Sequence, residues 1–312
     1  MRVLVAPDSF KGTFTAAEAA ELIAAGARAP GATITLLPLA DGGEGTLAVL
    51  AGSAPLIDAR TVDPWNRPIT ASFAMVGETA VVELARASGL HFGPGDPVTA
   101  STYGTGLLIA EALDRGARKV LIAAGGSATT DGGVGAVRAI TERGGTRGTR
   151  LTVLTDVTTP FEHAAVVFGP QKGATPAQVG ELTARLNELA SSFPKDPRGL
   201  ARTGAAGGFS GGLWAHFDAE LVDGAGRVLD VLGFDELLAC TDLVVVGEGR
   251  LDAQTGQGKI IDAVLRRVAK RVPVVAVVGS VSDDLGGYAA KFAEIIVAST
   301  AQELRAAGAR LG

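Results

Sequence analysis

Residue types that suit phosphate chemistry are concentrated toward the C-terminal end of the sequence, directly after an apolar run. Leu243–Val246 is mostly β-branched, which is typical of a strand buried on both faces. The turn that follows combines glycines, carboxylates and cations, namely Gly247, Glu248, Gly249, Arg250, Asp252 and Lys259. Backbone N–H groups at the glycines could approach a phosphate closely, but Glu248 and Asp252 would repel it. A divalent cation held by these two carboxylates would remove the conflict, so the stretch predicts a metal-assisted phosphate site.

Two nucleotide-binding signatures offer alternatives. A Walker loop ending at Lys259 requires a glycine six residues earlier and a hydroxyl residue directly after the lysine, but the sequence has Ala253 and Ile260 there, which excludes it. Gly43–Ala48 does match the dinucleotide pattern G-x-G-x-x-A. Because Asp41 and Glu44 would place carboxylates beside the pyrophosphate, a metal-assisted phosphate site fits this loop better, and a tight turn with solvated acids fits it equally well.

A second Gly-rich loop, Gly125–Gly135, follows the predicted strand Val120–Ala124. Successive backbone N–H groups in such a loop can form a nest for an anion, and the alternative is a packing turn. The candidate phosphate-binding residues are Gly125, Gly126, Ser127, Thr130 and Asp131. Lys172, just before a predicted helix, would add a cation, and a solvated surface lysine is its alternative.

The N-terminal segment carries a similar set of residues. Asp8, Ser9 and Lys11 come directly after the predicted strand Arg2–Ala6. Capping of the next helix would explain all three. Lys11, which is followed by Gly12 and Thr13, is better explained by contact with an anion.

Strands, loops and helices alternate at both ends of the chain, which is typical of a parallel α/β sheet. The middle differs, with a predicted hairpin from Leu56–Val62 to Ile69–Val76 and a short predicted strand at Val166–Phe168. We therefore predict a discontinuous parallel domain of Rossmann or flavodoxin type with three layers, built from residues 1–60 and 240–312. An inserted mixed α/β domain would span residues 61–239. Because ligands bind beyond the carboxyl ends of parallel strands, we expect the active site in the cleft between the two domains.

Composition excludes several classes of protein. The net charge of −5 and the absence of a basic cluster exclude a nucleic-acid footprint. The single cysteine, Cys240, excludes an intrachain disulfide, and the three scattered histidines lack zinc-ligand spacing. The longest apolar runs have the length of strands, so we expect no membrane partner and a cytoplasmic location.

Taken in order, these loops resemble the glycerate kinase family of the bacterial type. The matching stretches are APDSFKGT, PLADGGEGT, STYGTG, GGSATTDGG, FGPQKGA, GAAGG and GEGRLDAQTGQGK, spread from Ala6 to Lys259. The resemblance implies an enzyme of two α/β domains that phosphorylates D-glycerate, usually at the 2-hydroxyl, with ATP and Mg²⁺ as cofactors.

Phosphoryl transfer needs positioning, neutralisation of charge and orientation of the attacking oxygen, and the candidate residues divide accordingly. Asp41 or Asp252 would orient or deprotonate the substrate hydroxyl, and Glu248 and Asp252 would hold Mg²⁺. Lys11 and Arg250 would bind the glycerate carboxylate and the transferred phosphoryl group. The segment Gly125–Asp131, with Lys172, would hold the phosphates of ATP.

Two other functions stay open at this point. A nucleotide-dependent oxidoreductase would use the Gly43–Ala48 loop, and a non-catalytic module would bind a sugar acid or a nucleotide without turnover. The expected partner is a small-molecule substrate, and both a monomer and a homodimer are consistent with the sequence.

Overall fold

The computed structural model describes residues 1–27, 32–252, 259–268, 272–282 and 284–311. The chain divides into two compact units, which we call unit 1 (Met1–Asp41 with Ala225–Gly312) and unit 2 (Gly42–Gly224). Both units combine strands and helices, as predicted. Within the described ranges, no helix has the length and apolar character that a membrane span requires.

Unit 1 contains a five-stranded sheet in the order β11-β10-β9-β1-β2, in which all neighbouring strands are parallel. Numbered along the chain, this is the order 2-1-3-4-5 of flavodoxin-like sheets, so the predicted fold type is confirmed. The strands are β1 (Arg2–Pro7), β2 (Thr33–Leu36), β9 (Leu243–Glu248), β10 (Val274–Val278) and β11 (Glu294–Val297). The helices are α1 (Ala16–Gly26), α9 (Gly224–Val231), α10 (Phe234–Leu238), α11 (Ile260–Val268), the 3₁₀ helix η5 (Gly286–Lys291) and α12 (Ala301–Ala309).

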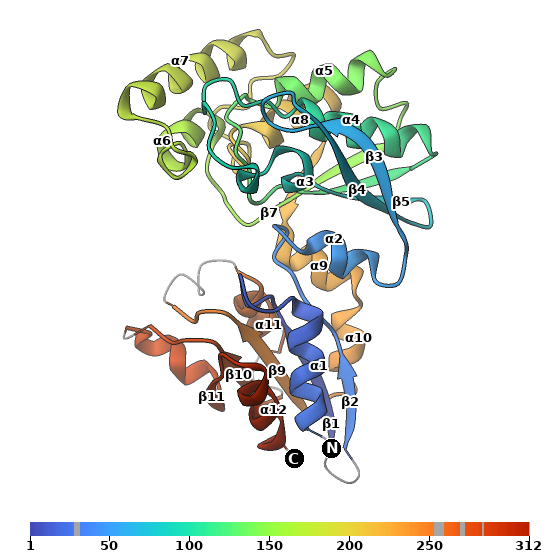
Figure 1. Ribbon diagram of the computed structural model, residues 1–312, viewed down its shortest axis with the longest axis vertical. Coiled ribbons are helices and arrows are strands. Elements are labelled where there is room, and N and C mark those ends of the chain that lie inside the picture. Colours follow the sequence, from blue (N-terminus) through green and yellow to red (C-terminus); the bar gives the residue numbers. More distant parts are fainter. Residues whose placement is uncertain (28–31, 253–258, 269–271, 283, 312) are drawn as a thin grey trace. The chain divides into compact units, whose positions relative to one another are not determined.

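Alternating side chains of the unit 1 sheet enter two separate cores, because successive residues of a strand point to opposite faces. Leu4 and Val244 pack with residues of α9, α10 and α11 on one face. Val3 and Val245 pack with α1 and α12 on the other, where the two helices lie side by side (Figure 1). The result is the predicted three-layer arrangement of helices, sheet and helices.

Unit 2 contains a six-stranded mixed sheet in the order β3-β4-β5-β6-β7-β8. The β3–β4 and β4–β5 pairs are antiparallel and the remaining pairs are parallel, so the predicted hairpin is confirmed. The strands are β3 (Leu56–Val62), β4 (Pro68–Val76), β5 (Thr79–Glu83), β6 (Lys119–Ala123), β7 (Arg150–Thr155) and β8 (Glu220–Asp223). The helices are α2 (Thr46–Ala51), α3 (Ala85–Ser88), η1 (Leu90–Phe92), α4 (Tyr103–Asp114), α5 (Val134–Glu142), η2 (Phe161–His163), α6 (Ala164–Phe168), η3 (Pro170–Lys172), α7 (Pro176–Ser192) and α8 (Phe209–Phe217).

The ends of unit 2 lie earlier in the chain than the predicted boundaries near residues 60 and 240. Helix α2 packs against β4 and β5, so it belongs to unit 2. Helices α9 and α10 supply Leu229 and Phe234 to a core of unit 1. The spacing of apolar residues predicts which face of a helix is buried, but it does not indicate which sheet covers that face.

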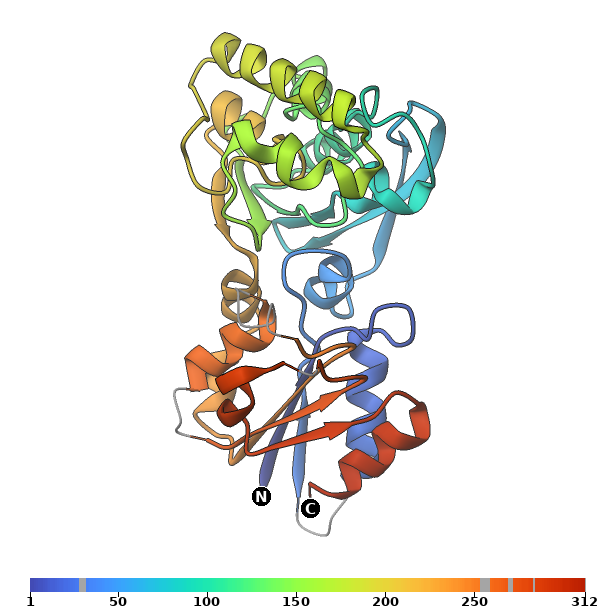
Figure 2. The ribbon, with the colours of Figure 1, turned by 90° about the vertical axis from the view of Figure 1, so that its left-hand side faces the viewer.

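The predicted strand Val166–Phe168 is wrong, because these residues form the end of α6. Ala164 and Ala165 are fully buried, whereas Val166 and Val167 are 55% and 53% exposed. The buried face of the helix is therefore formed by the small alanines. The β-branched valines dominate the sequence pattern, and for this reason the pattern predicts a strand. Helix α6 packs against the longer α7, and Figure 2 shows the two helices side by side in yellow-green and yellow.

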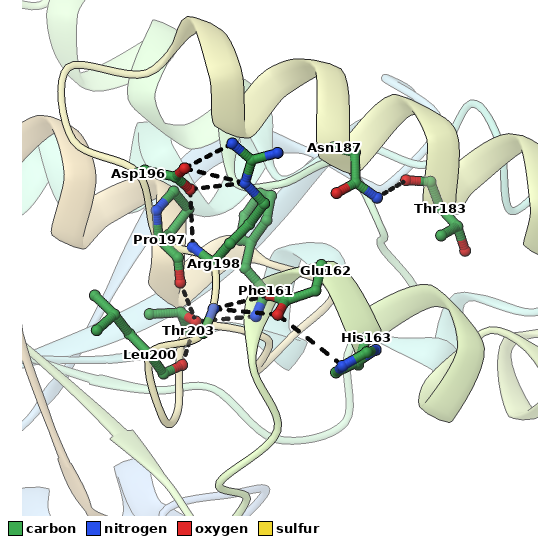
Figure 3. A network of polar contacts seen from close by, with 11 residues as sticks. Phe161, Glu162, His163, Thr183, Asn187, Asp196, Pro197, Arg198, Leu200 and Thr203 are labelled. Carbon is green, nitrogen blue, oxygen red and sulfur yellow. Dashed lines mark hydrogen bonds and ion pairs between the residues drawn. The ribbon is translucent and has the colours of Figure 1, made fainter.

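The segment between α7 and α8 is held by a network of polar contacts (Figure 3). The hydroxyl of Thr203 accepts a hydrogen bond from the N–H of Phe161 at 3.0 Å and donates to the carbonyl oxygens of Pro197 and Leu200. The Glu162 carboxylate accepts the N–H of Gly199. This irregular segment is thereby attached to η2, close to the start of the GAAGG stretch.

Candidate active site

A pocket of about 380 Å³ lies within unit 1, at the carboxyl ends of its strands. Its lining includes every residue predicted to be catalytic or to bind metal, namely Lys11, Asp41, Glu248, Arg250 and Asp252. Asp8, Lys259, Ser280 and Ser299 are also part of the lining. Three cationic and four acidic side chains therefore share one small polar pocket.

The position of the pocket follows from the strand order. Strand β1 has β2 on one side and β9 on the other, so the direction of winding reverses between β1 and β9. Loops that leave the two strands at such a switch point diverge and open a crevice. Asp8 directly follows β1 and Glu248 ends β9, and the N–H of Asp8 donates to the carbonyl oxygen of Gly247 at 2.8 Å.

Glycines allow the loops to approach one another at this crevice. A Cβ atom added to Gly279 would lie 2.6 Å from the carbonyl oxygen of Gly249, which is too close for any side chain. A Cβ atom on Gly249 would lie 3.4 Å from the backbone nitrogen of Lys11. The contact at Gly249 would be an ordinary van der Waals contact, whereas position 279 has no room for a Cβ atom. The loops after β9 and β10 can therefore meet at this pocket because residue 279 is a glycine.

Asp8 is the pocket residue whose chemistry sequence reasoning missed, since helix capping also explained it. Burial raises the pKa of Asp8 to about 7, and the nearby carboxylate of Asp41 adds to the rise. The N–H of Ser9, 2.6 Å from Oδ1 of Asp8, and the charge of Lys11 act in the opposite direction. The available signal was its place at the carboxyl end of a buried strand, the same argument that selected Glu248.

The carboxylates of this pocket suit Mg²⁺, a hard cation that prefers oxygen ligands. The repulsion that raises the pKa of Asp8, from Asp41 and more weakly from Glu248, is what a bound cation would relieve. In the described ranges no group of three or more His, Cys, Asp or Glu is arranged to hold a metal ion. Mg²⁺ commonly takes one or two protein carboxylates and completes its shell with water and substrate phosphates, so Glu248 and Asp252 fit such a site. Residues 253–258 of the same motif lie outside the described residues.

The predicted phosphate loop, Gly125–Asp131, lies in unit 2 after β6. Gly126 has φ of +70°, and a Cβ atom there would lie 2.4 Å from Oε1 of Glu44. The Asp131 carboxylate accepts hydrogen bonds from the N–H and hydroxyl of Thr102, both at 2.8 Å, and from the N–H groups of Gly133 and Gly135. Asp131 therefore holds the loop to the starts of α4 and α5.

Lys172 is not the solvated lysine of the alternative interpretation. Its side chain is buried, and Nζ donates hydrogen bonds to Oγ of Ser127 at 3.0 Å and to the carbonyl oxygen of Thr129 at 2.5 Å. Burial lowers the pKa of Lys172 to about 7, and the charge of Asp131 partly opposes this shift. The structure thus brings Lys172 together with the predicted loop. Its side-chain hydrogen bonds are with residues of the loop itself, Ser127 and Thr129.

The dinucleotide alternative at Gly43–Ala48 meets an obstacle in the structure. The buried carboxylate of Glu83 accepts the backbone N–H groups of Gly45 and Leu47, each at 3.1 Å. These N–H groups belong to the start of α2, where a pyrophosphate would have to bind. An acidic side chain of the protein thus takes the place of the phosphate.

A profile of the glycerate kinase family matches residues 3–145 and 141–310. Glycerate kinase of Bacillus subtilis (strain 168) is 38% identical, over 91% of this chain and 86% of that protein. Glycerate 2-kinase of Escherichia coli (strain K12) is 35% identical, over 92% of this chain and 87% of that protein.

A solved structure extends the likeness to the fold. The crystal structure of a protein assigned as glycerate kinase 2, from Salmonella typhimurium LT2, superimposes with a TM-score of 0.85 at 32% sequence identity. The match covers 100% of this chain and 95% of that one. The two sheets, the acidic pocket of unit 1 and these matches over nearly the whole chain lead to one conclusion: the chain belongs to the glycerate kinase family.

Proposed function

We propose that this kinase transfers a phosphoryl group from ATP to the 2-hydroxyl of D-glycerate in the presence of Mg²⁺, forming 2-phospho-D-glycerate. One observation carries the proposal: Lys11, Asp41, Glu248, Arg250 and Asp252 line a single pocket at the switch point of the unit 1 sheet. The relative from Escherichia coli named glycerate 2-kinase supports the 2-position. Phosphorylation at the 3-hydroxyl is the less favoured outcome, and the cytoplasm is the expected location.

The cationic side chains of the pocket match an anionic substrate. We assign Lys11 and Arg250 to the glycerate carboxylate and to the transferred phosphoryl group. Arginine can bind a carboxylate or a phosphate through two parallel N–H donors, which orients the anion as well as attracting it. Held in this way, the substrate would present its hydroxyl to the neighbouring carboxylates.

The acidic side chains would act on the substrate hydroxyl and on the cation. Asp41 or Asp252 would orient that hydroxyl or accept its proton. Glu248 and Asp252 would hold Mg²⁺, which when bound supplies neutralisation of the charge on the phosphates. Burial of Glu248, which is 9% exposed, would strengthen its interaction with a cation.

In unit 2, we assign the phosphates of ATP to the Gly125–Asp131 loop. Gly125 and Gly126 lack side chains that would cover the backbone, and a Cβ atom on Gly125 would lie 2.5 Å from Cα of Gly43. The side chains of Ser127 and Thr130 are buried, and Asp131 and Lys172 hold the loop. Backbone N–H groups would then be the principal ligands of the phosphates.

A turnover assay tests the proposal directly. Purified protein with ATP, Mg²⁺ and D-glycerate should release ADP, and the product should be identified by NMR as 2-phosphoglycerate. Formation of 3-phosphoglycerate would overturn the assigned position. ADP release that does not depend on D-glycerate, or none at all, would overturn the proposed reaction, and ligand-dependent thermal stabilisation without turnover would favour a binding module instead.

A further inference from the structure

Two basic side chains, Lys172 and Arg185, donate hydrogen bonds to consecutive peptide groups of the Gly125–Asp131 loop. Lys172, 8% exposed at the end of η3, donates to the carbonyl oxygen of Thr129 at 2.5 Å. Arg185 of α7 donates to the carbonyl oxygen of Thr130 at 2.7 Å, and to that of Val98 at 2.6 Å. Lys172 and Thr129 are 43 residues apart in the sequence, so their contact depends on the tertiary fold and not on local sequence.

The direction of these carbonyl groups determines the direction of the N–H groups. The peptide bonds of the described chain are all trans, so each N–H points opposite to the carbonyl oxygen of its own peptide unit. The N–H groups of Thr130 and Asp131 therefore point away from Lys172 and Arg185. Asp131 orients the following turn by accepting the N–H groups of Gly133 and Gly135.

We propose that Lys172 is a positioning residue: it holds Ser127 and the Thr129 carbonyl so that the loop presents its N–H groups to the nucleotide phosphates, and it does not bind phosphate itself. This inference rests on the proposed use of the loop by ATP. It changes the role expected for Lys172 from direct contact to support of the residues that make contact.

The surroundings of Lys172 favour positioning over contact. Two of the donors that Nζ carries are used within the protein, by Ser127 and Thr129. Lys172 is almost entirely removed from solvent, whereas Gly125 and Gly126 are half-buried and leave part of their surface open to solvent. Burying an amine is costly unless it is hydrogen-bonded, so its two bonds to the loop account for its presence there. Asp131 is the carboxylate that acts on it from the same loop.

The test compares Lys172→Met, which keeps the length of the side chain and removes its donors, with Lys119→Met at an exposed site of the same unit. Hydrogen exchange of the amides in residues 125–131 is measured together with kcat and with the KM values for ATP and D-glycerate. For K172M we expect amide exchange and the KM for ATP to rise by about 10-fold or more, because a displaced loop loses its aligned contacts. The KM for D-glycerate should change less than about 2-fold, and K119M should behave like the wild type in every measurement.

Each other outcome has a defined meaning. A fall in kcat with unchanged loop exchange and unchanged KM for ATP would overturn the inference, because Lys172 would then act on the reaction itself. Unchanged values throughout would overturn it as well. If K172M does not fold, Ser127→Ala removes one of the two contacts, and it must raise loop exchange for the inference to stand. Failure of wild-type turnover with D-glycerate would count against the proposed function alone, because loop exchange in K172M and K119M tests the anchor without any substrate.

Discussion

The backbone N–H of Asp8 lies 2.8 Å from the carbonyl oxygen of Gly247, and this hydrogen bond joins the ends of β1 and β9 at the switch point of the unit 1 sheet. Asp8, which follows β1, thereby lies near Glu248 at the end of β9 and near Asp41, which follows β2. Burial, and next the proximity of these carboxylates, raises the pKa of Asp8 to about 7. The consequence is an electrostatic cost that depends on pH and on bound cations.

Asp8→Asn should remove this cost. Because the pKa of Asp8 rises from 3.8 in the unfolded chain to about 7 in the folded protein, the folded state binds more protons between these values. The contribution of Asp8 to stability therefore falls as pH rises from about 4 to 7. Without divalent cations, D8N should melt above the wild type at pH 8, and the difference should shrink toward pH 4. Melting curves of both proteins across this range test the sign, and a constant difference would contradict it.

Asp41→Asn and Asp252→Asn should separate the two candidates for the residue that acts on the substrate hydroxyl. The variant that removes the base should lower kcat by about 100-fold or more, since general base catalysis contributes about 10²- to 10⁴-fold. Its melting temperature should stay close to that of the wild type. Asp284→Asn, at an exposed position of unit 1 outside the pocket, is the matched control. Near-normal kcat in both D41N and D252N would remove both residues from this role.

Much of the unit 1 site could be predicted because its rule is local. A buried strand followed by Gly and a carboxylate is visible in the sequence, and the carboxyl ends of parallel strands share one edge of a sheet. This argument selected Asp41, Glu248 and Asp252, which line one pocket. It could not assign the pKa of Asp8, because that value depends first on burial in the folded protein and then on Asp41, which follows another strand.

Unit 2 shows where local patterns were insufficient. The FGPQKGA pattern is also consistent with a solvated turn. The burial of Lys172 arises from contacts with Ser127 and Thr129, which lie 45 and 43 residues earlier in the sequence. Similarly, Val166 and Val167 predict a strand, but the neighbouring alanines determine which face of α6 is buried. At the start of α7, by contrast, Thr175 and Gln178 cap the helix through contacts that lie within one helical turn, so a local pattern is sufficient there.

Removal of divalent cations should abolish turnover, and added Mg²⁺ should restore it. Glu248→Gln keeps the shape of the side chain but loses the charge, so the Mg²⁺ concentration for half-maximal rate should rise about 10-fold or more. Stabilisation of the protein by Mg²⁺ in thermal melts should weaken in parallel, which gives a readout independent of turnover. Glu236→Gln, an exposed position in α10, is the control. The same Mg²⁺ dependence in E248Q and in the wild type would exclude Glu248 as a ligand.

Glu83→Ala should destabilise unit 2 and thereby test the obstacle to dinucleotide binding. The Glu83 carboxylate accepts the N–H groups of Gly45 and Leu47 at the start of α2, and its loss would leave both without this acceptor. We expect the free energy of unfolding to fall by about 1–3 kcal/mol, the usual cost of an unsatisfied buried donor.

Two comparisons make the Glu83 result specific. Glu83→Gln retains one side-chain oxygen as an acceptor, so it should recover much of the lost stability. Glu78→Ala removes a carboxylate with 70% side-chain exposure, where an ion pair with Arg118 contributes little, and should melt like the wild type. NAD⁺ or NADP⁺ should leave the wild-type melting temperature unchanged, because Glu83 takes the position that a pyrophosphate needs. A clear rise with either dinucleotide would show that Glu83 gives way to a ligand, and would revive the oxidoreductase alternative against the kinase proposal.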